Sequence, residues 1–220
     1  MVADSVEVVR AAARDALALV SPVDCAGCGR VDRSLCDRCL AMLAPSFELH
    51  PLTGTDPAVT VTTALRYEGV VRRAVLEFKQ NNRTGLARPL AAPLAALVRE
   101  VAVVGSLVVP VPPGRSSSRR RGYDPVALLL RRAGFHPTRA LRMVRASAGQ
   151  KQLGIDERLV NRLGSMRASA AVCRRPVVLV DDVVTTGATL AEAVRAVRDA
   201  GGVVTGAVAL AYTPRRTPWV

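Results

Sequence analysis

The sequence predicts an α/β fold built on a parallel sheet, with a small cysteine-rich unit near the N-terminus. Short apolar runs alternate with stretches of helical periodicity along most of the chain, which is typical of parallel α/β sheets. The run 177–180 is entirely aliphatic, as a strand buried on both faces requires. Half of the 220 residues are hydrophobic, which suffices for one main core and a small appendage.

The expected elements follow in order. Residues 1–20 have helical periodicity, and the charges of Arg10, Arg14 and Asp15 argue against a secretory signal. Strands are expected at 59–65, 107–111, 141–144, 177–180 and 203–212. Helices are expected at 69–79, 86–98, 124–133, 156–163 and 190–200, with Asp124 as an N-cap and Gly201-Gly202 as the last stop signal.

Composition also suggests how these elements are grouped. Residues 49–57 are rich in proline, threonine and glycine, which predicts a linker. We therefore expect an N-terminal helix and cysteine unit over 1–50, the α/β domain over 58–212 and a loose tail over 213–220. No apolar run approaches the roughly 20 residues that a membrane helix needs, so we expect a cytoplasmic protein without membrane insertion.

Two Cys-x-x-Cys pairs lie a short loop apart near the N-terminus. Their members are Cys25, Cys28, Cys36 and Cys39. Four thiolates around one ion leave no open coordination position, which predicts a structural zinc site. Two disulfides, which a reducing cytosol disfavours, and an iron–sulfur cluster are the alternatives. Cys173 stands apart and is expected to be a small buried apolar side chain.

The chain is strongly basic, with a net charge of +13. Lys79 and Lys151 are its only lysines, so arginine supplies almost all of the positive charge. One guanidinium group can donate two parallel hydrogen bonds to the oxygens of a phosphate. A nucleic acid or a phosphorylated ligand is therefore the expected partner. An arginine-rich solvated surface is the alternative. Aromatic residues are few, which argues against a base-stacking platform.

An acidic pair and a hydroxyl-rich turn follow the aliphatic run 177–180 and precede the last helix. A glycine turn that opens a helix is an anion cradle, because its amides point at the bound phosphate. The carboxylates just ahead can accept hydrogen bonds from sugar hydroxyls, so the pattern predicts a ribose 5-phosphate site. Its predicted residues are Asp181, Asp182, Val183, Val184, Thr185, Thr186, Gly187, Ala188 and Thr189. The alternative is an ordinary strand-to-helix turn capped by threonine.

A second loop combines a proline-rich strand end with several arginines. Its candidate ligand-binding residues are Arg115, Arg119, Arg120, Arg121 and Tyr123. The stretch is too polar to be buried, so we expect a flexible loop that closes over pyrophosphate or grips a nucleic-acid backbone. A solvated surface loop is the alternative.

The turn at 181–189 resembles the fingerprint of type I phosphoribosyltransferases, which have a Rossmann-like parallel sheet and bind phosphoribosyl pyrophosphate (PRPP). In that family the acidic pair holds the ribose hydroxyls, the Thr-Gly turn holds the 5-phosphate, and Mg²⁺ accompanies PRPP. Further motifs make nearly the whole chain similar to the ComF/GntX family. They are the cysteine unit, Pro110-Val111-Pro112, Phe78-Lys79, Arg121-Gly122-Tyr123 and Gln152…Arg158…Asn161.

The resemblance implies a protein that handles single-stranded DNA during DNA uptake in natural transformation, beside a helicase machinery, and that retains a PRPP pocket. An active Mg²⁺-dependent transferase and a catalytically silent PRPP sensor are the alternatives. Thr185 stands where purine-salvage relatives carry an acidic general base, which disfavours purine salvage. A position of this segment away from any open cleft, or two aspartates tied up in internal salt bridges, would overturn the assignment.

Overall fold

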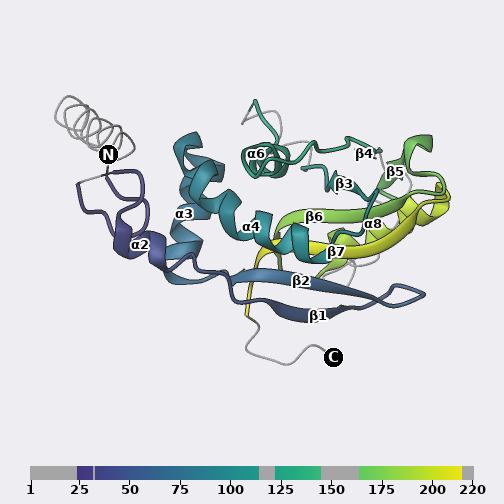
Figure 1. Cartoon of the computed structure of the whole chain (residues 1–220), viewed down its shortest axis with the longest axis horizontal. Helices are drawn as coiled ribbons and strands as arrows, with labels where there is room; N and C mark the ends of the chain where they lie inside the picture. Colours follow the sequence, from purple (N-terminus) through teal and green to yellow (C-terminus); the bar gives the residue numbers. More distant parts are fainter. Residues whose placement is uncertain (1–23, 32, 114–121, 145–163, 215–220) are drawn as a thin grey trace, which may run out of the picture.

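The computed structural model describes residues 24–31, 33–113, 122–144 and 164–214. Its core is a five-stranded sheet in the order β1-β2-β7-β6-β3 (Figure 1). The strands are β1 (Glu48–Leu52), β2 (Val59–Arg66), β3 (Leu107–Pro110), β6 (Pro176–Val184) and β7 (Val203–Tyr212). The last four are mutually parallel, while β1 pairs with β2 antiparallel. The predicted α/β class with a mostly parallel sheet is therefore confirmed.

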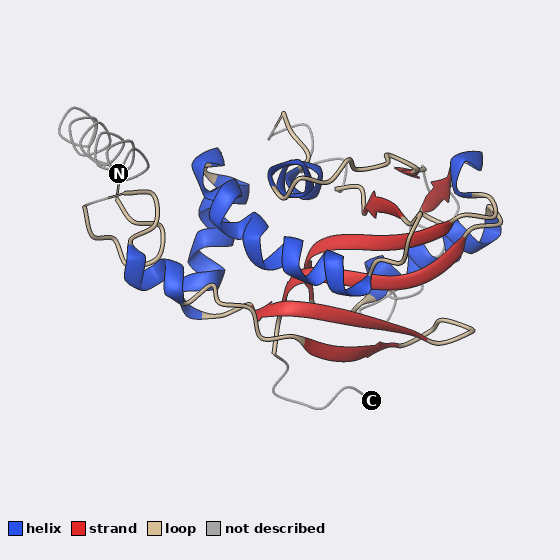
Figure 2. Ribbon diagram, in the orientation of Figure 1, coloured by secondary structure: helices blue, strands red, loops and turns tan. Residues whose placement is uncertain are grey.

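Helices cover both faces of this sheet (Figure 2). On one face lie α3 (Gly69–Gln80), α4 (Ala87–Val101) and α6 (Pro125–Arg132), and on the other lies α8 (Ala188–Asp199). The alternation of side chains along β6 divides the core accordingly. Val178 and Val180 pack with the first group of helices, whereas Val177 and Leu179 pack with α8. A strand buried on both faces is what the aliphatic run predicted.

The linker expected over 49–57 is wrong in its first part, because residues 48–52 form β1. The strand alternates, with Leu49 exposed and His50 and Leu52 buried. Pro51 fits there because β1 lies at the edge of the sheet, where a missing N–H costs no ladder bond. The division into units at 1–50, 58–212 and 213–220 stays a prediction.

The smaller elements add one strand that the sequence did not suggest. The strand expected at 141–144 is β4 (Leu141–Met143), but it pairs antiparallel with β5 (Met166–Ala168) in a separate two-stranded sheet that packs against α8. Within the described residues there are also two 3-10 turns, η1 (Thr84–Leu86) and η2 (Ala170–Val172), and the short helix α2 (Asp37–Ala41). The helices expected at 1–20 and 156–163 lie outside the described residues.

Two predicted helix signals are confirmed, and the predicted burial of Cys173 is wrong. Asp124 caps α6 by accepting a 3.0 Å hydrogen bond from the Ala127 amide. The chain turns at Gly201, with a φ of 76°, after the end of α8. Cys173 is exposed rather than buried, because η2 buries Val172 and the chain then turns outward. No helix among the described residues is long and apolar enough to cross a membrane.

Candidate metal centre and ligand site

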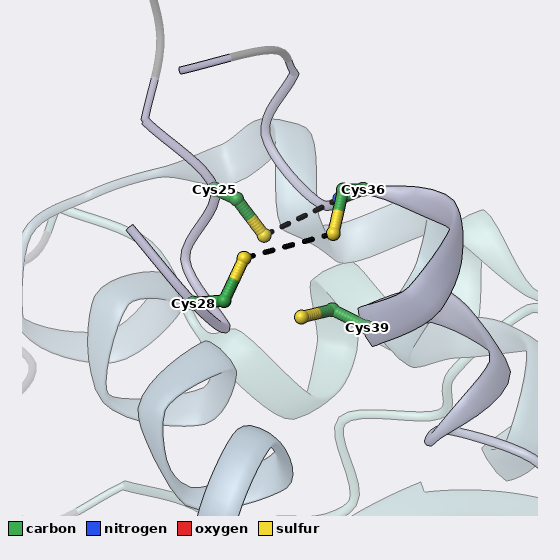
Figure 3. A group of neighbouring side chains, drawn as sticks. All are labelled: Cys25, Cys28, Cys36 and Cys39. Atoms are coloured by element: carbon green, nitrogen blue, oxygen red, sulfur yellow. Dashed lines mark hydrogen bonds between the residues drawn. The ribbon is translucent and has the colours of Figure 1, made fainter. Parts of the chain in front are cut away.

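The four cysteines converge on one point (Figure 3). Their sulfur atoms all lie within 4.8 Å of one another, and the Cys28 and Cys36 sulfurs are 3.7 Å apart. Zinc–sulfur bonds of about 2.3 Å in a tetrahedron separate the sulfurs by roughly 3.8 Å, so the spacing fits such an ion. All four thiols are free, which excludes the disulfide alternative in this structure. The cluster can hold a metal ion and is consistent with a zinc knuckle.

Backbone geometry prepares the cluster for a cation. Cys36 lies at the N-cap of α2 and Cys39 one turn later, so both face the Cys25–Cys28 turn. Burial raises the pKa of Cys25, but amides of Cys36, Cys28 and Gly27 donate to its sulfur and lower that pKa to about 6. Burial, reinforced by the neighbouring sulfurs, raises the pKa of Cys39 to about 12. Cys25 is therefore readily a thiolate, whereas a nearby cation would favour ionisation of Cys39.

The knuckle is fastened to the α/β unit through backbone carbonyls. The Nε atom of Arg73, on α3, donates to the Gly27 carbonyl. Arg83, just after α3, donates to the Asp24 carbonyl and lies 3.6 Å from the Glu77 carboxylate. The cysteine cluster is thus held against α3, which follows β2 in the chain (Figure 1).

The acidic pair lies inside β6 rather than after it, which corrects the expected strand end at residue 180. Asp181 is paired with Ala209 of β7, and the ladder continues to Val184 opposite Tyr212. Both carboxyl side chains are half-buried. The Asp181 carboxylate accepts a 2.8 Å hydrogen bond from the Asp182 amide. Asp182 instead meets Lys79, which reaches it from the last turn of α3.

The Lys79–Asp182 contact is a close ion pair. The ammonium nitrogen lies 2.9 Å from each carboxylate oxygen, and the side chains are 22% and 15% exposed. The requirement that the aspartates be free of internal salt bridges therefore fails for Asp182. A carboxylate has about four lone-pair positions, so one ammonium does not use them all. The pair fixes Asp182 and leaves it part of its accepting capacity.

The hydroxyl-rich turn opens α8 as the pattern predicted. Thr185 and Thr186 are exposed, and Gly187 adopts a φ of 77°, which favours glycine. The N-cap residue Gly187 has no side chain to cap the helix, but the Thr186 hydroxyl accepts a 3.4 Å hydrogen bond from the Ala188 amide, so the threonine-capped alternative holds for one amide of the turn. The first intrahelical bond runs from Ala191 to Gly187. Amides of the first turn therefore have no acceptor within the helix.

The basic loop is only partly within the structure. Arg115, Arg119, Arg120 and Arg121 lie outside the described residues, as do Gln152, Arg158 and Asn161. Tyr123 is half-buried, with its ring 5.8 Å from that of Phe78 and its hydroxyl donating to the Phe78 carbonyl. The end of β3 borders a pocket of about 360 Å³. Its lining residues are Pro110, Pro112, Pro113, Gly122, Tyr123, Asp124, Arg139 and Leu141.

A polar cluster that sequence reasoning missed lies where β1, β2 and β7 meet. Glu48 accepts hydrogen bonds from the Arg66 Nε atom, at 3.0 Å, and from the Tyr212 hydroxyl, at 2.7 Å. Buried His50 lies 3.1 Å from the Thr63 hydroxyl. Burial lowers the pKa of His50 despite the nearby Glu48 carboxylate. No local motif marks these residues, because they come from separate strands.

Comparison with known proteins gives limited similarity. No family model and no curated protein sequence matches the chain. Solved structures do match, among them one described as the structure of the allosteric regulatory enzyme of purine biosynthesis. That match has 22% identity and a TM-score of 0.34, and it covers 57% of this chain. The chain spans a quarter of that protein's length, at 25%. The functional proposal therefore rests on the chain's own residues.

Proposed function

We propose that the chain binds a phosphoribosyl ligand, PRPP with Mg²⁺, at the junction of β6 and α8. The supporting observation is the order of groups there, in which half-buried carboxylates near the end of β6 are followed by a hydroxyl-rich turn and the N-terminus of α8. The amides and threonine hydroxyls of the turn suit a 5-phosphate. Asp181 and Asp182 suit ribose hydroxyls, since ionised carboxylates only accept hydrogen bonds.

The residues present fit Mg²⁺ as a companion of the ligand. Mg²⁺ prefers oxygen ligands and usually binds through one or two carboxylates together with substrate phosphates. Asp181 and Asp182 would supply the protein oxygens, and the ion would offset charge on the pyrophosphate. Thr185, with an ordinary hydroxyl, does not act as a base at neutral pH. We therefore propose binding of PRPP without purine salvage. If the protein is an enzyme, it would transfer the phosphoribosyl group to a nitrogen acceptor other than a purine.

Calorimetric titration with Mg²⁺ and PRPP tests this proposal. Wild type should bind, and the double variant Asp181→Ala/Asp182→Ala should bind at least about tenfold more weakly, which corresponds to about 1.4 kcal/mol. Glu100→Ala is the matched control, because Glu100 is an exposed acidic residue on α4. Absence of binding by wild type, or equal binding by the double variant, would reject the site.

A second candidate function is the binding of single-stranded DNA, in keeping with the similarity to ComF/GntX proteins and their role in DNA uptake. The net charge of +13 favours it. Exposed arginines also gather beside the metal centre, where Arg30, Arg38 and Arg73 border a pocket of about 510 Å³ with Met42 and Val70 on its lining. Such a surface supplies cations for the phosphates of a single strand.

The DNA candidate is tested by its salt dependence. Fluorescence anisotropy with a labelled oligonucleotide should give an affinity that falls steeply with salt, with a log–log slope of about −0.7 per neutralised phosphate. Arg30→Ala/Arg38→Ala should reduce that slope, whereas Arg88→Ala on α4 serves as the control. Salt-independent binding would contradict this function. A DNA-uptake helicase is the partner to test only after DNA binding is established.

A further inference from the structure

Lys79, in the last turn of α3, forms an ion pair with Asp182 of the proposed ligand site. We propose that Lys79 is a positioning residue of the phosphoribosyl site, which fixes the Asp182 carboxylate and offsets its charge so that an anionic ligand can bind beside it. This inference rests on the proposed function. It begins from the close ion pair, in which one ammonium nitrogen lies 2.9 Å from both oxygens of Asp182.

The need for such a cation follows from the charges at the site. Asp181 and Asp182 are adjacent in β6, and the ligand would add phosphate charge a few residues further along. Two unpaired carboxylates would repel that ligand, and the half-buried setting screens the repulsion less than bulk water does. Lys79 cancels one of the two negative charges. Its ammonium also has three donors, so it can hold the carboxylate and still face an anionic oxygen.

The position of Lys79 is set by the ends of α3 rather than by the ligand. Near the start of the helix, Val70 lines the pocket beside the cysteine cluster, and Arg73 donates to the Gly27 carbonyl of the knuckle. In the last turn, Phe78 is 1% exposed and its carbonyl accepts a hydrogen bond from the Tyr123 hydroxyl. The backbone of Lys79 is thereby held in place before any ligand arrives, which is preorganisation.

The residue type also fits the role. Lysine is rare in this arginine-rich chain, yet one of its two lysines lies at this position. An ammonium is a compact charge that fits a half-buried position in less space than the larger planar guanidinium, although both can contact the two oxygens of a carboxylate. The ion pair lies in the last turn of α3, where the helix dipole also favours a cation.

A double-mutant cycle tests whether Lys79 acts through Asp182. Wild type, Lys79→Met, Asp182→Asn and the combined variant are titrated with Mg²⁺ and PRPP in a calorimeter. Lys79→Met should weaken binding at least about tenfold in wild type and less than about threefold in the Asp182→Asn background. Arg88→Met, which removes an exposed cation from α4, is the control and should stay within about twofold of wild type. A merely structural lysine would give equal losses in both backgrounds.

The outcomes separate this inference from the function on which it rests. Wild type that fails to bind PRPP overturns both. Wild type that binds, with Lys79→Met binding equally well, overturns only the role of Lys79, and so does an additive cycle. Lys79→Gln is the second variant, because it keeps a hydrogen-bond donor without the charge. Failure of both single lysine variants to fold, with a folded combined variant, would assign the pair to stability and overturn the ligand role.

Discussion

Gly27 has no room for a side chain beside the cysteine cluster. It lies between the first two cysteines and faces both Cys39 and α3. A Cβ atom there would lie 2.6 Å from the Cys39 sulfur, 2.8 Å from the Cys39 Cβ and 2.9 Å from a methyl group of Val70. None of these neighbours is the far end of a long flexible side chain. Gly27→Ala should therefore displace a metal ligand or the knuckle as a whole.

The expected cost can be worked from these distances. Carbon atoms in contact normally lie about 3.5–4.0 Å apart, so the new methyl group is about 1 Å too close to several atoms at once. Overpacking of this kind costs about 1–3 kcal/mol. At about 2–4 °C per kcal/mol for a chain of this size, the melting temperature should fall by roughly 2–12 °C. Disturbed support of a ligand should also weaken metal binding by about tenfold or more.

Gly85→Ala is the matched control. Its Cβ would meet only the Ser34 hydroxyl, at 3.5 Å, which is ordinary contact. Replacing that glycine should leave stability unchanged or raise it by up to about 1 kcal/mol, because the unfolded chain loses freedom. Thermal unfolding and the zinc content of the purified proteins are the two measurements. A Gly27→Ala protein that keeps full zinc and the wild-type melting temperature would refute the close packing of the knuckle against Cys39 and α3.

Three further predictions concern stability, measured by urea unfolding. Asp124→Ala should cost about 0.5–2 kcal/mol through loss of the α6 cap. Burial raises the pKa of Glu192, but hydrogen bonds from Arg195 and the Met166 amide hold that pKa below its usual value. The free energy of unfolding should therefore fall as the pH drops below about 4.5. Glu192→Gln should show a smaller fall over the same pH range. Burial lowers the pKa of His50, so the imidazole takes up a proton when the chain unfolds below pH 6.5. Wild type should therefore lose stability as the pH falls below 6.5. His50→Gln should lose less stability between about pH 5 and 7.

The fold was largely predictable because its strands are apolar runs with few polar interruptions. The runs at 59–65, 107–111, 177–180 and 203–212 all became strands of the main sheet. Two strands escaped for identifiable reasons. β1 contains Pro51 and precedes a turn-rich stretch, so its composition resembles a linker. β5 has three residues, too few for a period-two pattern to emerge.

The candidate site was predictable only where its residues are close in sequence. The cysteines and the 181–189 turn are local patterns, and the structure brings the cysteines together as their spacing indicated. Lys79 and Asp182 are 103 residues apart, so their pairing depends on how α3 packs against the sheet. The same holds for the Tyr123–Phe78 bond and for Glu48 with Tyr212. Such contacts belong to tertiary packing, and no spacing rule in the sequence contains them.

The acidic pair illustrates why a strand need not end where its apolar run ends. β7 is buried from Ala207 to its last residue, and its ladder with β6 runs as far as Val184 opposite Tyr212. That pairing carries the two aspartates inside a regular strand, where successive side chains diverge. Asp182 meets the cation of α3, while Asp181 accepts the amide of Asp182 itself. Any ligand bound at this junction therefore meets one carboxylate whose charge Lys79 offsets and a second that accepts the Asp182 amide.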